Sequence, residues 1–73
     1  MSYEIFRHQI AIENNMIETY GIKVYENNKL LRTVYDVSTD FNAITKLVYL
    51  LNVENIELIH FESVLEDFYL DNV

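Results

Sequence analysis

The spacing of apolar residues changes once along the chain, after Asp36-Val37, and this change constrains the fold most strongly. Before it, apolar and polar residues alternate, which is typical of strands with one buried side. After it, apolar residues recur every three or four positions, which is typical of amphipathic helices. The sequence therefore predicts a sheet first and helices second.

Asparagine pairs divide the first half into three predicted strands, at residues 4–13, 17–26 and 29–37. A two-residue turn at Asn27-Asn28 joins the second pair of strands, because asparagine tolerates positive φ. For the first pair we predict a three-residue loop, Asn14 to Met16. These loops put one apolar set on a common inner side. That set comprises Phe6, His8, Ile10, Tyr20, Ile22, Val24, Leu31, Thr33 and Tyr35.

Two helices are predicted in the second half. Ser38, Thr39 or Asp40 can cap a first helix that ends near Asn52, and a second helix runs from about Ile59 to Leu70. We expect Val53, Ile56 and Leu58, in the connector, to point inward. The expected apolar stripes are Phe41, Ile44, Leu47, Val48 and Leu51, then Phe61, Val64, Leu65 and Phe68. Residues 1–73 thus form a single α+β domain, a three-stranded antiparallel meander packed on one face by a C-terminal helical hairpin (β-β-β-α-α).

The same register places Arg7, Lys23 and Arg32 side by side on the outer side of the sheet. Ile5, Tyr25 and Leu30 would form the next row, and together the two rows are a candidate surface for an acidic partner. The alternative is that these cations only extend into water and shield the sheet. A bulge at Gly21, the only glycine, would break up the basic row.

The net charge of −7 lies entirely in residues 36–73, because the charges of residues 1–35 sum to zero. This argues against nonspecific binding of nucleic acid, which requires cations. Glu62, Glu66 and Asp67 share the outer side of the second predicted helix. They are interpreted as a solvated face, as a capping box of Ser63 with Glu66, or as an acidic surface for a partner.

No catalytic or metal motif is present. His8 is expected to be a buried, hydrogen-bonded neutral residue, and His60 to order the connector through a backbone carbonyl. We expect capping to explain the acids and hydroxyls near Asp40. No cofactor, metal or catalytic residue is therefore predicted, and the chain is not expected to be an enzyme.

The order of Tyr20-Gly21-Ile22, the D-V-S-T-D step at 36–40 and the H-x-x-x-V-x-E-D-F segment at 60–68 resembles a small uncharacterised domain family of spore-forming Firmicutes. The resemblance covers residues 20–69. It implies this fold and a bacterial cytoplasm, and it implies no activity.

Our favoured hypothesis is a noncatalytic protein-interaction or regulatory module that binds a protein partner or itself, as a homodimer. The alternative is an acidic inhibitor or nucleic-acid mimic that blocks a basic groove on a partner. The chain lacks cysteine, a secretory signal and any long apolar run, so we expect a cytoplasmic protein that binds neither membrane nor nucleic acid directly.

Overall fold

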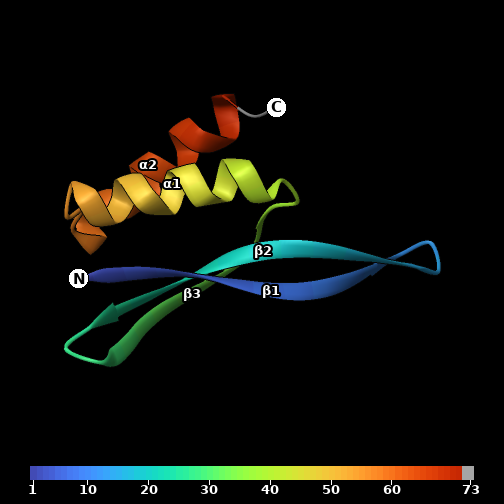
Figure 1. Ribbon diagram of the computed structural model, residues 1–73, viewed down its shortest axis with the longest axis horizontal. Helices are drawn as coiled ribbons and strands as arrows, with labels where there is room; N and C mark the ends of the chain where they lie inside the picture. The colour runs from blue at the N-terminus through green and yellow to red at the C-terminus, as the bar shows by residue number, and fades with distance from the viewer. Residues whose placement is uncertain (72–73) are drawn as a thin grey trace.

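The computed structural model describes residues 1–71, in which three strands are followed by two helices (Figure 1). The strands are β1 (Ser2–Ile12), β2 (Asn15–Glu26) and β3 (Lys29–Ser38), and the helices are α1 (Phe41–Val53) and α2 (Leu58–Asp71). The strands form one antiparallel sheet in the order β1-β2-β3. The predicted β-β-β-α-α fold is confirmed. Neither helix is long and apolar enough to cross a membrane, as far as residues 1–71 show.

Both hairpins close with two-residue turns whose residues have positive φ. The second turn is at Asn27 (52°) and Asn28 (66°), as predicted, but the first is at Glu13 (49°) and Asn14 (67°). Two successive residues at positive φ are typical of the turn whose twist matches that of the flanking strands. The predicted loop from Asn14 to Met16 is therefore wrong, and Ile12 lies opposite Asn15.

The shorter first turn exchanges the two sides of β1. Tyr3 lies opposite Val24 and Ile5 opposite Ile22, so these β1 residues share the helix-facing side of the sheet. The predicted inner set of β1, namely Phe6, His8 and Ile10, lies on the open side instead. Because β1 carries apolar residues on both sides, its alternation alone does not determine the register.

Two irregularities change the pairing of β2 with β3. The register shifts between Val24 and Tyr25, and again between Tyr20 and Ile22. The second shift lies opposite Gly21, where a bulge was predicted, but the additional residues are on β3, between Val34 and Ser38. The predicted partners are wrong, because Val24 faces Arg32, Ile22 faces Val34 and Tyr20 faces Ser38. Leu31 and Tyr35, which were expected inside, are 39% and 65% exposed.

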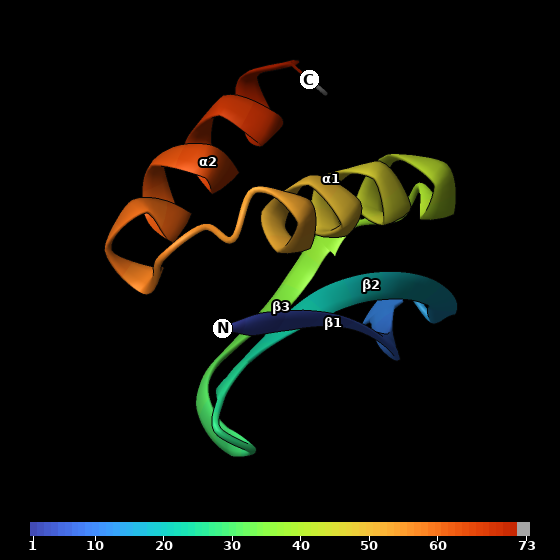
Figure 2. The same cartoon turned by 60° about the vertical axis from the view of Figure 1, so that its left-hand side comes forward.

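α1 lies over the sheet. α2 lies beside α1, and its C-terminal end leans away from the sheet (Figure 2). The predicted stripe of α2 is confirmed, with Phe61 and Leu65 buried and Val64 and Phe68 packed against the core. The stripe of α1 is confirmed except for Phe41, which is exposed; of the connector residues, Ile56 and Leu58 pack inward and Val53 does not. The core residues are Tyr3, Ile22, Val24, Val37, Ile44, Leu47, Val48, Leu51, Phe61 and Leu65.

Polar contacts attach the helices to the sheet. The Asn52 side chain of α1 accepts a hydrogen bond from Tyr3 N (2.9 Å) and donates one to Tyr3 O (2.9 Å). The Tyr3 hydroxyl donates to Ile56 O (2.6 Å) in the connector. At the other end of α1, the Asp40 side chain caps the helix by accepting from Asn42 N and Ala43 N, as predicted. The alternative capping box at Ser63 is wrong, because Ser63 lies inside α2.

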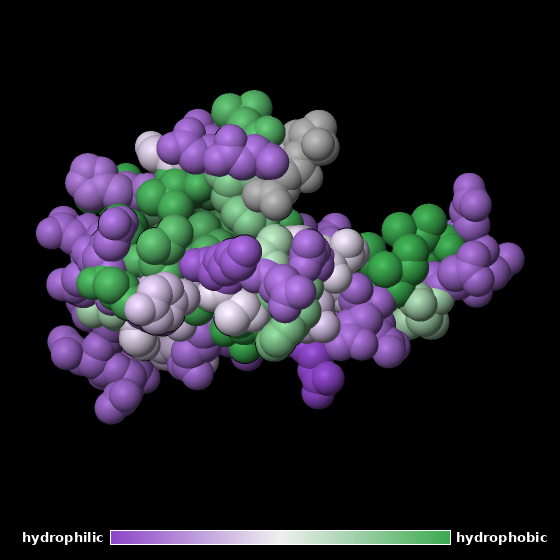
Figure 3. Space-filling model, turned by 45° about the horizontal axis from the view of Figure 1, so that its top comes forward, coloured by the Kyte–Doolittle hydropathy of each residue, from purple (hydrophilic) through white to green (hydrophobic). Residues whose placement is uncertain are grey.

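β1 and β2 continue past the end of β3 and form a two-stranded arm, residues 9–18 (Figure 1). Ile12 and Met16 near its tip are 47% and 62% exposed. Figure 3 shows apolar residues gathered on this projection, with hydrophilic residues at its end.

Candidate functional site: a groove between the helices

The structure separates the residues of the predicted basic row. Arg7 lies opposite Tyr20 on the helix-facing side, Lys23 lies on the open side between Glu4 and Thr33, and Arg32 lies opposite Val24. The row required a register that the two-residue first turn and the irregularities of β3 do not allow. Of the neighbouring apolar row, only Tyr25 and Leu30 lie together, as direct cross-strand partners.

Two of these cations form ion pairs within the chain. Arg7 Nη1 lies 3.6 Å from Glu18 Oε1, and the Arg32 guanidinium contacts the Glu62 carboxylate of α2. Arg32 also lies over the Phe61 ring, 5.8 Å from its centroid. Glu62 is thus partly neutralised, Glu66 is exposed, and Asp67 lies at the rim of a groove described below.

The open side of the sheet carries an aromatic cluster made of Phe6, His8 and Tyr35. Their ring centroids lie 5.2–5.4 Å apart, and Lys23 Nζ lies 5.2 Å from the centroid of Phe6. His8 Nε2 accepts a hydrogen bond from Asp36 N (2.9 Å), which requires Nε2 to be unprotonated. His8 is hydrogen-bonded as expected, but it is half-buried on the open side rather than inside the core.

Asp36 has a positive φ of 53° in the irregular part of β3. Its carboxylate accepts a hydrogen bond from the buried Thr19 hydroxyl (2.7 Å), which also lies 3.2 Å from Ser38 O. Together with His8, these contacts hold the irregular backbone in place. We assign this cluster a structural role.

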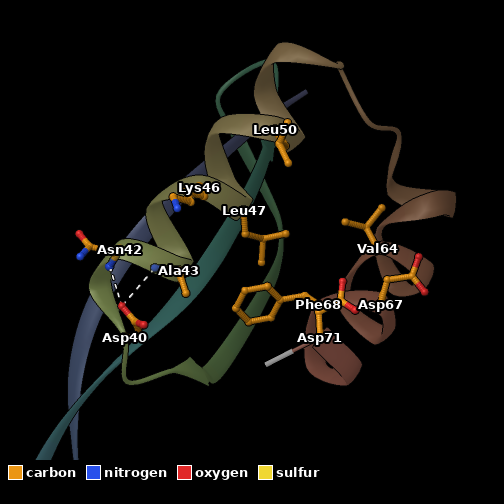
Figure 4. A pocket seen from close by; sticks show the side chains of 10 residues that line it. All are labelled: Asp40, Asn42, Ala43, Lys46, Leu47, Leu50, Val64, Asp67, Phe68 and Asp71. Carbon is orange, nitrogen blue, oxygen red and sulfur yellow. Dashed lines mark hydrogen bonds between the residues drawn. The ribbon is translucent and has the colours of Figure 1, made fainter. Parts of the chain in front are cut away.

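The candidate site is a groove of about 450 Å³ between α1 and α2. Leu47 and Leu50 of α1 and Val64 and Phe68 of α2 form its apolar floor (Figure 4). The groove lies where α2 leans away from the sheet toward its C-terminal end (Figure 2). Leu50 is 51% exposed, so this floor is accessible.

The rim of the groove is acidic. Asp40 at the start of α1 and Asp67 and Asp71 on α2 line it, against a single cation, Lys46. The last turn of α2 contains no basic residue, so the negative end of its helix dipole is not offset. An apolar floor with an acidic rim is complementary to a basic amphipathic ligand.

The described residues place no metal-binding cluster at the groove. Across residues 1–71, no group of three or more His, Cys, Asp or Glu side chains could hold a metal ion. The Asp40 carboxylate is occupied by the α1 backbone. His60 lies exposed in the first turns of α2, where its backbone N–H donates to Glu57 O (2.9 Å).

The groove was not predicted from the sequence as a site. Asp67 is its only member among the predicted site residues; Asp40 was predicted only as a cap, and Asp71 and Lys46 were given no role. One signal was present, since Leu50 lies beside the main stripe of α1 and remains exposed after the core is filled. An exposed apolar residue beside the stripe indicates that the apolar face of the helix is wider than the area packed within the chain.

Comparison with known proteins identifies a family that covers nearly the whole chain. The profile of a family described as a family of unknown function, DUF6514, matches residues 1–71. The match includes the first strand, which the expected range of 20–69 left out. No curated protein and no solved structure matches the chain.

Proposed function

The chain belongs to DUF6514, a family of unknown function, and we propose that it is a noncatalytic module that binds a basic amphipathic segment of a partner protein. The observation that carries this proposal is the groove between α1 and α2, with an apolar floor and three aspartates at its rim. An amphipathic helix that lays its apolar side in such a groove is a common mode of peptide recognition.

The spacing of the floor residues supports a helical ligand. Leu47 and Leu50 are three positions apart on α1, and Val64 and Phe68 are four positions apart on α2. Each pair therefore forms a short apolar row about one turn long, one row on each helix. A ligand helix with apolar residues at the same spacing would contact both rows, and its lysines or arginines would reach Asp67 and Asp71.

Other observations support the remaining parts of the hypothesis. A noncatalytic role is supported by the dispersed placement of the titratable side chains. A bacterial cytoplasmic location is supported by the cysteine-free sequence and by the family resemblance. The alternative is an acidic inhibitor or nucleic-acid mimic. The acidic surface that it requires is reduced, because Glu62 pairs with Arg32.

Calorimetric titration with a synthetic peptide of leucine and lysine, designed as an amphipathic helix of about 15 residues, tests this proposal. We expect the substitution Asp67→Lys to weaken binding by about tenfold, because it places a cation beside the ligand's cations. Glu66→Lys is the matched control, since it makes the same charge change one residue away, outside the groove lining, and should weaken binding less than about threefold.

A second pair of variants tests the apolar floor. Leu50→Gln should weaken binding by about tenfold, whereas Tyr49→Gln, at the neighbouring exposed position, should leave it unchanged. The groove proposal is wrong if Leu50→Gln has no effect and both charge reversals weaken binding equally. That combination would indicate recognition by acidic charge alone.

A further inference from the structure

The outer edge of β1 is a long, regular strand edge without a strand beside it in residues 1–71. β1 is an edge strand, and its register with β2 runs without interruption from Ser2 to Ile12. It contains no proline and no bulge, two of the devices that protect an exposed edge. The opposite edge, β3, is interrupted by two register shifts.

The contacts of Asn52 reveal which backbone groups of β1 are free. Asn52 binds both N and O of Tyr3, so these groups point away from β2. Because this direction alternates along an antiparallel strand, Ile5, Arg7, Gln9 and Ala11 also direct N–H and C=O outward. These outward groups make no hydrogen bond within residues 1–71.

The free edge therefore has two defined ends. Asn52 closes it at Tyr3, and the Glu13-Asn14 turn closes it beyond Ala11 and Ile12. The midpoint of the free segment from Ile5 to Ala11 is His8.

We propose that the occupant of this edge is a second copy of the chain, paired antiparallel to β1 about a two-fold axis at His8. In this register Ile5 of each copy lies opposite Ala11 of the other, and Arg7 lies opposite Gln9. Each outward N–H and C=O of the four free residues then finds a partner. The Tyr3–Asn52 contact of each copy lies beyond the end of the other copy's β1, so it does not obstruct the pairing.

The side chains favour this register over its neighbour. An axis at Arg7 would place two guanidinium groups opposite each other and would bring Ala11 against the closed end at Tyr3. The axis at His8 places Arg7 opposite a neutral glutamine and brings Phe6 opposite Ile10 on the open side. Cross-strand pairs of an aromatic with a β-branched residue stabilise a sheet.

The arm supplies a second argument. A two-stranded ribbon is only marginally stable in water, yet residues 9–18 extend beyond β3 with apolar side chains exposed. In the dimer the arm of each copy lies beside β1 of the other and becomes part of one continuous sheet. A hollow of about 630 Å³ lined by Ile5, Arg7, Tyr20 and Phe41 adjoins the same edge, beside the position that Ala11 of the second copy would take.

Sedimentation equilibrium of the full chain tests the proposal. The expected species has twice the 8.7 kDa mass of one chain. Gln9→Pro removes an outward N–H and places a ring at the edge, so it should weaken dimerisation by about tenfold or more while the far-UV circular dichroism of the helices is retained. Gln9→Ala keeps the N–H and is the matched control, with less than about a threefold effect.

Amide hydrogen exchange on the unmodified chain gives a readout that depends on no substitution. Exchange at Ile5, Arg7, Gln9 and Ala11 should slow as concentration rises, whereas Phe6, His8 and Ile10, which bond to β2, should change little. A chain that stays monomeric up to about 1 mM would overturn the proposal. A dimer in which those four amides exchange at one rate at every concentration would also overturn it. These outcomes do not depend on the groove.

Discussion

At the scale of single residues, Gly21 shows how one position sets a local structure. A Cβ atom built on Gly21 would lie 2.4 Å from Val34 O and 2.6 Å from two atoms of the Phe6 ring. The ring of Phe6 occupies the space that a side chain would need, and it joins the aromatic cluster on the open side. The only glycine of the chain therefore permits both the irregular β3 pairing and the packing of Phe6.

We predict that Gly21→Ala lowers the free energy of unfolding by more than about 2 kcal/mol, because the contact with Val34 O involves backbone that must move. Urea denaturation followed by circular dichroism measures this change. Thr33→Ala, at a half-buried position on the same side of the sheet, should cost less than about 1 kcal/mol. Equal losses for the two variants would contradict the steric explanation.

Tyr3 links the sheet to the connector, and its burial makes the stability of the fold depend on pH. Burial raises the pKa of the Tyr3 hydroxyl above its ordinary value of 10.0, so the folded state holds this proton more tightly than the unfolded state. Stability from this group is fully present below pH 10 and is lost as the pH rises through the higher folded-state pKa. Burial, with a smaller effect of Asp36, raises the pKa of Tyr69 in the same direction.

We therefore expect the urea concentration at the unfolding midpoint to decrease as the pH rises above about 10. Tyr3→Phe should cost about 1 kcal/mol at pH 7, because the hydrogen bond to Ile56 O is lost. The same variant should show a shallower alkaline decline than the unmodified chain. Identical declines in the two proteins would show that Tyr3 does not contribute to the pH dependence.

At the scale of elements, Asn52 joins α1 to β1. Its side chain takes the place of a neighbouring strand at Tyr3, with one donated and one accepted hydrogen bond. We predict that Asn52→Ala lowers the free energy of unfolding by about 1–3 kcal/mol, since two backbone groups lose their partners. Asn42→Ala is the control on the exposed first turn of the same helix, and it should cost less than about 0.5 kcal/mol.

Thermal or urea unfolding of the two asparagine variants measures this difference. Similar stabilities would mean that water replaces Asn52 at the edge without cost. In that case Asn52 would not fix the end of the free segment of β1.

The elements differ in how far the sequence determines them. Helix boundaries depend on local signals, such as the Asp40 cap and the 3.6-residue period, and both helices were predicted closely. Strand register depends on the position of the turn, and Glu13 at positive φ gives little sequence signal, whereas Asn27-Asn28 gives a clear one. Shortening the first loop from three residues to two was sufficient to exchange the two sides of β1.

At the scale of the whole molecule, the surface follows from these element-level details. The predicted basic row depended on the register and disappeared with it, because Arg7 and Arg32 moved to the helix-facing side. The groove depends on the angle between α2 and the sheet, which no local pattern encodes. The acidic character of the second half was visible in the sequence, but its concentration at the rim of an apolar groove was not.

The central claim is that the groove between α1 and α2 binds a basic amphipathic helix. The most direct test is nuclear magnetic resonance of the labelled chain during titration with the leucine–lysine peptide. We predict that the largest chemical-shift changes occur at Leu47, Leu50, Val64 and Phe68, with smaller changes on the open side of the sheet. Changes confined to Glu54, Glu57 and Glu66, or the absence of any change at millimolar peptide, would contradict the claim.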